Sequence, residues 1–154
     1  MKKSKNKMTI LVHLPAYREP ELIPTIKSAL ENAKNPERIH FGICRQFNPE
    51  DGFDNVDEYR DDPRFKIKDI PYEEAKGLAY ARGVINDDLL TDEDFVCQLD
   101  SHHRFSENWD ETKTRHHNRL NNLNYSYHVK LITRCLFPAS SFELFLIFVG
   151  ILLL

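Results

Sequence analysis

The sequence predicts an α/β fold with a mostly parallel sheet. Two observations predict it: short apolar runs of strand length alternate with segments of helical periodicity, and polar residues follow directly after one of these runs. Alternating strands and helices are typical of parallel sheets joined by right-handed crossovers. A chain of 154 residues, 41% of them hydrophobic, can bury the core of one domain. We therefore expect an open sheet covered by helices on both faces.

The first strand, helix and second strand occupy the first third of the chain. The apolar run 8–14 is the first expected strand, and Pro15 ends it. Apolar residues recur at helical spacing in segment 21–33, and a proline in the first turn of this helix removes no hydrogen bond. The run 39–44 is the second expected strand.

Two further strands and a helix are expected before residue 100. The acidic segment 48–62 is interpreted as a solvated surface loop with at most one helical turn. Segment 65–70 alternates like a half-exposed strand, segment 77–90 is helical, and the run 95–99 is expected to be a central buried strand. The apolar face of the expected helix carries Leu78, Ala81, Ile85 and Leu89.

Beyond residue 105 the pattern weakens. Ser106 is a possible N-cap of a short helix, and from Arg115 onward no sustained period is found. The apolar run 144–154 is shorter than the roughly 17 to 25 residues that span a membrane. We expect no spanning segment, although this run allows weak peripheral membrane association.

Composition limits the classes of partner and compartment. A formal net charge of −3 gives no reason to expect nucleic acid as a partner. The basic tail 1–7 precedes an apolar run too short for a signal peptide. Cys44, Cys97 and Cys135 form no CxxC motif, and the first two lie in strand-like runs. We interpret them as buried thiols in a reducing compartment, and predict a cytoplasmic protein.

A carboxylate and an imidazole follow the expected strand 95–99. Asp100 and His102 are two residues apart, so in extended chain their side chains point the same way, in a DxD-like arrangement. Such a pair suits manganese or magnesium, with water and phosphate oxygens completing the shell. The alternative is that both are ordinary surface or capping groups. The neighbouring pairs His102–His103 and His116–His117 do not favour zinc, because adjacent side chains rarely face one ion.

Gly77 and Arg82 are candidate phosphate-binding residues. Gly77 opens the expected helix and lets backbone approach a ligand, and Arg82 follows one turn later. The alternative is a plain helix start, with Arg82 paired to Asp87 or Glu74.

The residues after the first expected strand are candidates for nucleotide binding. Tyr17 can stack on a base and Arg18 can contact a phosphate, because ligands of open sheets bind at the carboxyl ends of strands. Alternatively, Pro15 only ends the strand and Tyr17 covers the edge of the core.

Several segments together resemble the GlcNAc-transferase family, whose best-known members add GlcNAc to hydroxyproline on a cytoplasmic ubiquitin-ligase adaptor. The Asp-Ser-His element also resembles the metal motif of the polypeptide GalNAc-transferases, which share the GT-A fold. The segments that carry the resemblance are Leu14–Leu22, Asn35–Cys44, Gly77–Arg82, Gln98–Phe105 and Asn108–Asp110.

The resemblance implies a GT-A-like, Rossmann-like nucleotide-sugar-binding half at 8–112, between the basic tail 1–7 and a non-family tail 113–154. It implies that Asp100 and His102 bind the manganese or magnesium ion that holds the UDP diphosphate. No catalytic residue is identified. The residues implied for the nucleotide sugar are Pro15, Tyr17, Arg18, Gln46, Gly77 and Arg82.

The function implied is metal-dependent transfer of GlcNAc from UDP-GlcNAc to an unidentified acceptor, a protein hydroxyl or a glycan. GT-A enzymes use a second half to bind the acceptor, and the tail 113–154 does not resemble it. We therefore expect an incomplete C-terminal half produced by a frameshift or premature end, and the chain is then either an inactive fragment, which we favour, or a short active form. The alternative is a nucleotide-sugar or metal-binding module without catalysis. A metal-dependent hydrolase ranks last, because it needs more ligands than the chain offers in order.

Overall fold

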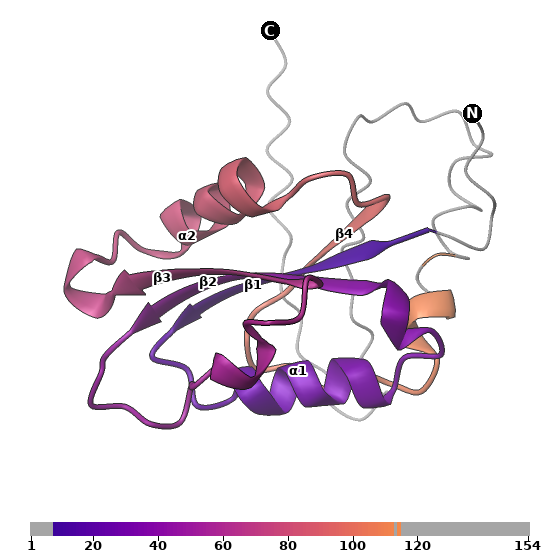
Figure 1. The fold of residues 1–154 in the computed structure, drawn as a ribbon, viewed down its shortest axis with the longest axis horizontal. Helices are drawn as coiled ribbons and strands as arrows, with labels where there is room; N and C mark the ends of the chain where they lie inside the picture. Colours follow the sequence, from indigo (N-terminus) through magenta and orange to yellow (C-terminus); the bar gives the residue numbers. More distant parts are fainter. Residues whose placement is uncertain (1–7, 113, 115–154) are drawn as a thin grey trace, which may run out of the picture.

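The computed structural model describes residues 8–112 and 114, which form a four-stranded parallel sheet with helices on both faces (Figure 1). This arrangement confirms the predicted α/β class. The strands are β1 (Ile10–Tyr17), β2 (Ile39–Phe47), β3 (Phe65–Pro71) and β4 (Phe95–Gln98). The helices are α1 (Leu22–Glu31), α2 (Leu78–Val84) and its π-helical continuation η5 (Ile85–Leu89). Short 3-10 turns lie in the connections at η2 (Pro36–Arg38), η3 (Asp57–Tyr59) and η4 (Tyr72–Glu74).

The strands lie in the order β3-β2-β1-β4, and every neighbouring pair is parallel. The prediction that 95–99 forms a central strand is wrong within the described residues, where β4 pairs only with β1. An apolar run indicates that both faces of a strand are buried, and Phe95, Val96 and Cys97 are indeed buried. It does not indicate how many strands lie beside it.

β1 is longer than predicted, because Pro15 does not end it. The strand continues to Tyr17, paired with β2 throughout. The backbone oxygen of His13 accepts a hydrogen bond from Leu99 on the β4 side, 3.2 Å away. The backbone groups of residues two apart in a strand point to the same neighbouring strand, so the backbone nitrogen of Pro15 faces the β4 side, as His13 does. Because β4 has ended at this level, the missing N–H of Pro15 removes no hydrogen bond between strands.

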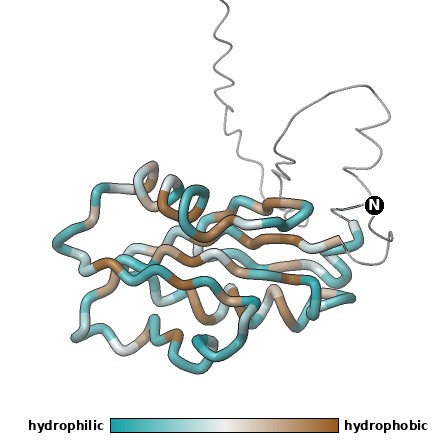
Figure 2. Tube along the Cα trace, turned by 45° about the horizontal axis from the view of Figure 1, so that its top comes forward, coloured by the Kyte–Doolittle hydropathy of each residue, from teal (hydrophilic) through white to brown (hydrophobic). Residues whose placement is uncertain are grey.

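Side chains of β1 alternate between the two helices. Ile10, Val12, Leu14 and Ala16 belong to the core cluster that contains α1, whereas Leu11 belongs to the cluster that contains Ala81, Ile85 and Leu89. Figure 2 shows hydrophobic residues concentrated along the strands and hydrophilic residues in the connecting loops. Each face of the sheet therefore has its own core, and odd-numbered residues of β1 face α2.

The helix predicted at 77–90 is present, but its apolar face begins later than expected. Leu78 is 50% exposed at the first helical residue, whereas Ala81, Ile85 and Leu89 are buried. Gly42 in β2 allows this helix to approach the sheet, since a Cβ atom at this position would lie 2.8 Å from Cγ2 of Ile85.

The chain after β4 folds back along α1. A helical turn begins at Trp109, whose indole Nε1 donates to the backbone oxygen of Ala29 over 2.8 Å. The predicted N-cap at Ser106 is therefore wrong: the turn starts after Asn108, which has a φ of 56°. Burial of the indole, 2% exposed, determines where the helix begins.

The loop 48–62 contains one 3-10 turn, as expected, but its acidic residues are not all solvated. Asp54 is 1% exposed and lies beside Arg45, with 3.5 Å between Oδ1 and Nη1. Burial raises the pKa of Asp54 above its usual value, against the opposing effect of Arg45.

Some predictions lie outside the described residues. They concern the basic tail 1–7, Cys135, the pair His116–His117, the tail 113–154 apart from Thr114, and the apolar run 144–154. Cys44 and Cys97 are buried, as predicted. Among the residues described, no helix is both long and apolar enough to cross a membrane.

Candidate functional site

Several predicted site residues lie at the carboxyl edge of the sheet, on the face covered by α2. Tyr17 at the end of β1 lies opposite Gln46 of β2 in the strand register. His13 lies opposite Gln98 of β4, and Asp100 follows two residues later. Because side chains of one parity share a face, these positions all lie on the α2 side. The sequence prediction placed Asp100 just after a strand, as the structure does, and the register adds the face that it shares with Tyr17 and Gln46.

Tyr17 and Arg18 form the turn that leaves β1. Tyr17 is 56% exposed, so its ring is accessible for stacking. Arg18 has a φ of 45°, and its backbone N–H donates to the oxygen of Gln46 over 2.9 Å. Its guanidinium is engaged by Asp51, with Nε 2.6 Å from Oδ2 and Nη2 3.2 Å from Oδ1. Sequence reasoning missed Asp51, because no local pattern links residues 33 positions apart.

Pro15 and Gln46 line the interior of the same corner. Both are buried, and Gln46 is only 2% exposed. Its side-chain oxygen Oε1 has no hydrogen-bond partner among the described residues. A buried amide oxygen without a partner is costly, which marks Gln46 as a polar group available to a ligand after a small rearrangement.

Gly77 and Arg82 bring α2 to the site. Gly77 has φ 85° and ψ 178°, a conformation that favours glycine, and it precedes the first residue of α2. Nη2 of Arg82 lies 3.3 Å from Oδ1 of Asp100. Arg82 therefore pairs with Asp100, whereas the alternative considered from the sequence was a pair with Asp87 or Glu74. The structure thus joins two predicted site residues that are 18 positions apart.

His13 of β1 connects the sheet to α2 at Arg82. It is 1% exposed, and its Nε2 lies 3.3 Å from the backbone oxygen of Arg82. Burial lowers the pKa of His13 below its usual value, so the ring is neutral at pH 7 and can donate to this oxygen. His13 therefore fixes the helix turn that carries the Arg82 guanidinium.

The turn 100–103 carries the predicted cation ligands. The side chains of Asp100 and His102 are 50% and 58% exposed, whereas Ser101 between them is buried. Nδ1 of His102 lies 3.6 Å from Oε2 of Glu19, and Nδ1 of His103 lies 2.7 Å from the backbone oxygen of Asp100. The two predicted ligands project into solvent from a turn whose middle is packed.

These donors fit a divalent cation whose shell is shared with other oxygens. Within residues 8–112 and 114, no three His, Cys, Asp or Glu side chains are grouped closely enough to enclose a metal ion. Asp100 and His102 supply a hard oxygen and an imidazole, both accessible. Magnesium and manganese keep water and phosphate oxygens in such mixed shells, so two protein donors are compatible with either ion.

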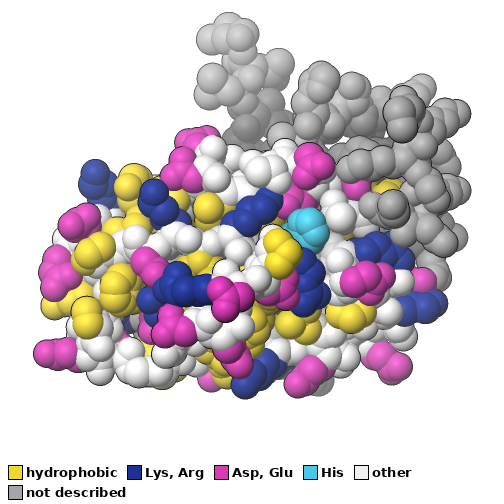
Figure 3. Space-filling model, viewed as in Figure 1, with side chains coloured by type: hydrophobic (Ala, Val, Ile, Leu, Met, Phe, Trp, Pro, Cys, Tyr) yellow, Lys and Arg dark blue, Asp and Glu magenta, His cyan; other side chains and the backbone are white. Residues whose placement is uncertain are grey.

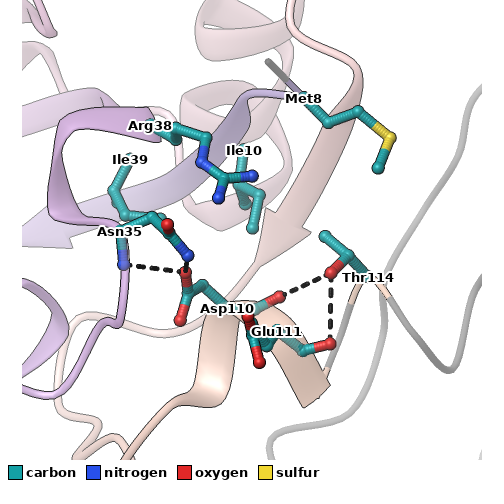
Figure 4. Close-up of a pocket in the computed structure, with 8 residues that line it drawn as sticks. All are labelled: Met8, Ile10, Asn35, Arg38, Ile39, Asp110, Glu111 and Thr114. Carbon is teal, nitrogen blue, oxygen red and sulfur yellow. Dashed lines mark hydrogen bonds between the residues drawn. The ribbon is translucent and has the colours of Figure 1, made fainter. Parts of the chain in front are cut away.

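A small cavity lies at the opposite, amino edge of the sheet, and it belongs to the scaffold. It holds about 10 Å³, space for about one water molecule. Figure 4 shows Asp110 pointing at Asn35 there, and its carboxylate also accepts from the backbone N–H of Lys34 at 2.8 Å. Burial acts to raise the pKa of Asp110, but these hydrogen bonds hold it below its usual value. The cavity is lined by Met8, Ile10, Asn35, Arg38, Ile39, Asp110, Glu111 and Thr114.

Charges of both signs are interspersed on the face drawn in Figure 3. This face therefore offers mixed charges and not one continuous basic surface. Ion pairs are common in the described chain: Arg45 and Arg60, for example, both contact Asp69, at 2.8 and 2.5 Å.

Two solved structures share the fold. The chain resembles the crystal structure of S. aureus TarS 1–349 in complex with UDP-GlcNAc, with a TM-score of 0.58 and 15% identity over 75% of this chain and 32% of that one. It resembles a crystal structure of S. aureus TarS with a TM-score of 0.54 and 16% identity, over 72% of this chain and 20% of that one. The chain spans about a third and a fifth of these chains. At this identity the likeness shows a GT-A-like fold.

No curated protein matches the chain significantly. The glycosyltransferase (GlcNAc) family, in contrast, matches residues 9–63 and, in an overlapping stretch, residues 54–134. The second stretch extends past residue 112, where the resemblance visible in the sequence ends, and the two together cover most of the 154 residues. The chain therefore belongs to the glycosyltransferase (GlcNAc) family.

Proposed function

We propose that this chain binds UDP-GlcNAc at the carboxyl edge of its sheet and forms the donor-binding part of a metal-dependent GlcNAc transferase. The observation that carries the proposal is the meeting of Asp100 with Arg82 on the α2 face, beside the corner of Tyr17 and Gln46. Acidic, basic and aromatic groups in one place suit a ligand that combines a cation, an anionic diphosphate and a base. Family membership and the UDP-GlcNAc bound to the TarS relative support the choice of donor.

In this proposal, Asp100 and His102 hold manganese or magnesium against the UDP diphosphate. When bound between these residues and the diphosphate, such an ion would supply Lewis-acid stabilisation of negative charge on the UDP leaving group. Arg82, next to Asp100, is placed to contact a diphosphate oxygen. Asp51 engages Nε and Nη2 of Arg18, so phosphate competes with Asp51 for this guanidinium.

The nucleoside is proposed to bind at the carboxyl ends of β1 and β2, beside Tyr17 and Gln46. The exposed ring of Tyr17 stacks on the base, and Pro15 forms the apolar floor beside it. Gln46 supplies the amide whose oxygen has no partner within the described chain. Gly77 leaves room at the start of α2, since no heavy atom lies within 4 Å of a Cβ built there.

The acceptor is proposed to be a hydroxyl group of a protein or glycan. The resemblance to transferases that modify hydroxyproline supports a protein acceptor, and the two buried thiols, Cys44 and Cys97, support a cytoplasmic location.

A second candidate is a nucleotide-sugar-binding module without transfer activity. It rests on the same groups at the carboxyl edge, the Asp100–Arg82 pair and the exposed Tyr17 ring, which can bind a ligand without a catalytic group. Both candidates require donor binding, but only the first predicts release of UDP when an acceptor hydroxyl is present.

The test is a calorimetric titration of the full chain with UDP-GlcNAc in manganese, with Asp100→Ala and His102→Ala as the site variants. We expect each variant to weaken binding at least about tenfold, because each removes a ligand of the cation. Asp61→Ala is the matched control, because Asp61 is an exposed acid between η3 and β3. Equal affinity of the wild type and both site variants would refute the assigned cation site.

A further inference from the structure

One buried hydroxyl holds the turn that carries the predicted cation ligands. Thr25 of α1 is 0% exposed. Its Oγ1 lies 3.0 Å from the backbone oxygen of Ser101 and 3.1 Å from that of His103, and it accepts from the N–H of His103 at 3.0 Å. A hydroxyl has one hydrogen and two lone pairs, so it accepts from His103 while it donates to one of the two carbonyls. Three backbone groups of the turn thus converge on one side-chain atom.

The backbone is the main constraint on where the two ligands project. The ion pair of Asp100 with Arg82 is 3.3 Å long and half exposed, and that of His102 with Glu19 is 3.6 Å long. Exposed ion pairs of this kind order side chains weakly. Thr25, in contrast, contacts the backbone on both sides of His102 from inside the core.

We propose that Thr25 is a positioning residue of the donor site: its hydroxyl orders the turn 100–103 so that Asp100 and His102 present their donor atoms together. This inference rests on the proposed function, in which those two residues hold the cation and the UDP diphosphate. A turn ordered before binding spares the ligand the entropic cost of ordering it, and so raises affinity.

Ser28 distinguishes positioning from general stabilisation. It lies one turn further along α1, and its Oγ accepts from the N–H of Phe105 at 3.0 Å in a buried contact. Thr25 and Ser28 therefore tie the same segment to the same helix through the same kind of bond. If Thr25 only stabilised the fold, loss of either hydroxyl would have similar consequences.

The experiment compares Thr25→Val, Thr25→Ser and Ser28→Ala in the full chain by amide hydrogen exchange and by titration with UDP in manganese. Thr25→Val keeps the branched shape and removes the hydroxyl. We expect it to accelerate exchange at His103 and weaken UDP binding by about tenfold, the size of effect that supporting groups have on metal sites. Thr25→Ser should restore both. Ser28→Ala should accelerate exchange at Phe105 and leave UDP affinity unchanged.

The outcomes separate this inference from the proposed function. Wild-type protein that binds UDP, together with Thr25→Val that binds it equally well, would overturn the inference alone. The inference also fails if Ser28→Ala weakens UDP binding as much as Thr25→Val does. Folded wild-type protein that fails to bind UDP in manganese would overturn the proposed function and, with it, the role of Thr25 in ligand positioning. Unchanged exchange at His103 in Thr25→Val would show that the hydroxyl does not order the turn.

Discussion

The charged residues at the carboxyl edge are already paired with one another. Arg18 contacts Asp51 through two guanidinium nitrogens, and Arg82 contacts Asp100. A diphosphate that binds here competes with a carboxylate for the donors of each arginine. Such competition lowers the net affinity and also excludes weaker anions, so the pairs act on specificity.

Arg18 and Asp51 give a test of this exchange. Arg18→Ala should weaken UDP binding, and Asp51→Asn should strengthen it by up to about fivefold, because this substitution removes the carboxylate charge that competes with phosphate for Arg18, and an exposed ion pair is weak. The pair is partly exposed, with side-chain exposures of 40% and 13%. Calorimetric titration with UDP measures both effects.

Titration with uridine, which lacks phosphate, provides the control for this pair. Neither substitution should change uridine affinity if Arg18 acts on phosphate alone. A wild-type affinity for UDP in Arg18→Ala would contradict the assignment of Arg18 to the phosphates.

The packing of η5 on β2 depends on a glycine. Gly42→Ala should destabilise the fold by about 1–3 kcal/mol, because the added Cβ would lie 2.8 Å from Cγ2 of Ile85, a methyl group fixed to the branched carbon. Urea unfolding measures the loss. Gly83→Ala in α2 is the control: no atom lies within 4 Å of a Cβ added there, so this helix should gain about 0.5–1 kcal/mol. A neutral Gly42→Ala would show that η5 moves freely on the sheet.

A buried carboxylate connects three elements at the amino edge of the sheet. Glu93, whose side chain is 0% exposed, lies before β4 and accepts from Lys66 of β3 at 2.6 Å. Its Oε1 is also 2.9 Å from Nδ1 of His40 in β2. Burial acts to raise the pKa of Glu93, but the hydrogen bonds from Lys66 and His40 lower it to about 2. The charged form is therefore the stabilising one.

The low pKa of Glu93 predicts that this residue stabilises the fold in an acid-sensitive way. Because the pKa is lower in the folded than in the unfolded state, the contribution of Glu93 to the free energy of unfolding is present above about pH 4.5 and is lost as the pH falls toward 2. The shift corresponds to about 3 kcal/mol at neutral pH. Glu93→Gln should lose this amount at pH 7, and its free energy of unfolding should approach that of the wild type near pH 2.

Denaturant unfolding at several pH values measures the effect of Glu93→Gln. Asp61→Asn, which replaces an exposed acid, is the control and should follow the wild-type curve. A constant difference between Glu93→Gln and the wild type from pH 7 to pH 2 would contradict the assignment.

Over the whole molecule, the periodicity of apolar residues predicted the strands and helices, but it did not predict contacts between residues that are distant in the sequence. The apolar runs and the helical spacing report burial, which is local information. The continuation of β1 through Pro15 depends on where β4 ends, and the edge position of β4 depends on pairing. Likewise, Thr25 and Asp51 carry no local signal, because their partners lie 76 and 33 residues away. The sequence predicted the groups that are proposed to touch the ligand, and the structure adds the groups that hold them.

The amino edge and the carboxyl edge of the sheet carry different kinds of polar group. The amino edge carries the buried Glu93 network and the capping carboxylate of Asp110, which are structural. The carboxyl edge carries exposed Tyr17, Asp100 and His102, together with Gln46, whose amide oxygen is unsatisfied within the described residues. The unpartnered amide oxygen of Gln46, which costs stability, thus lies at the edge proposed for the donor.

Binding of UDP-GlcNAc at this edge through a divalent cation can be tested directly. The measurement is a calorimetric titration of the wild-type chain with UDP-GlcNAc, first in manganese and then with manganese removed by a chelator. We predict saturable binding in manganese and a loss of at least about tenfold in affinity without it. Equal binding under both conditions, or no binding by folded protein in manganese, would contradict the proposed function.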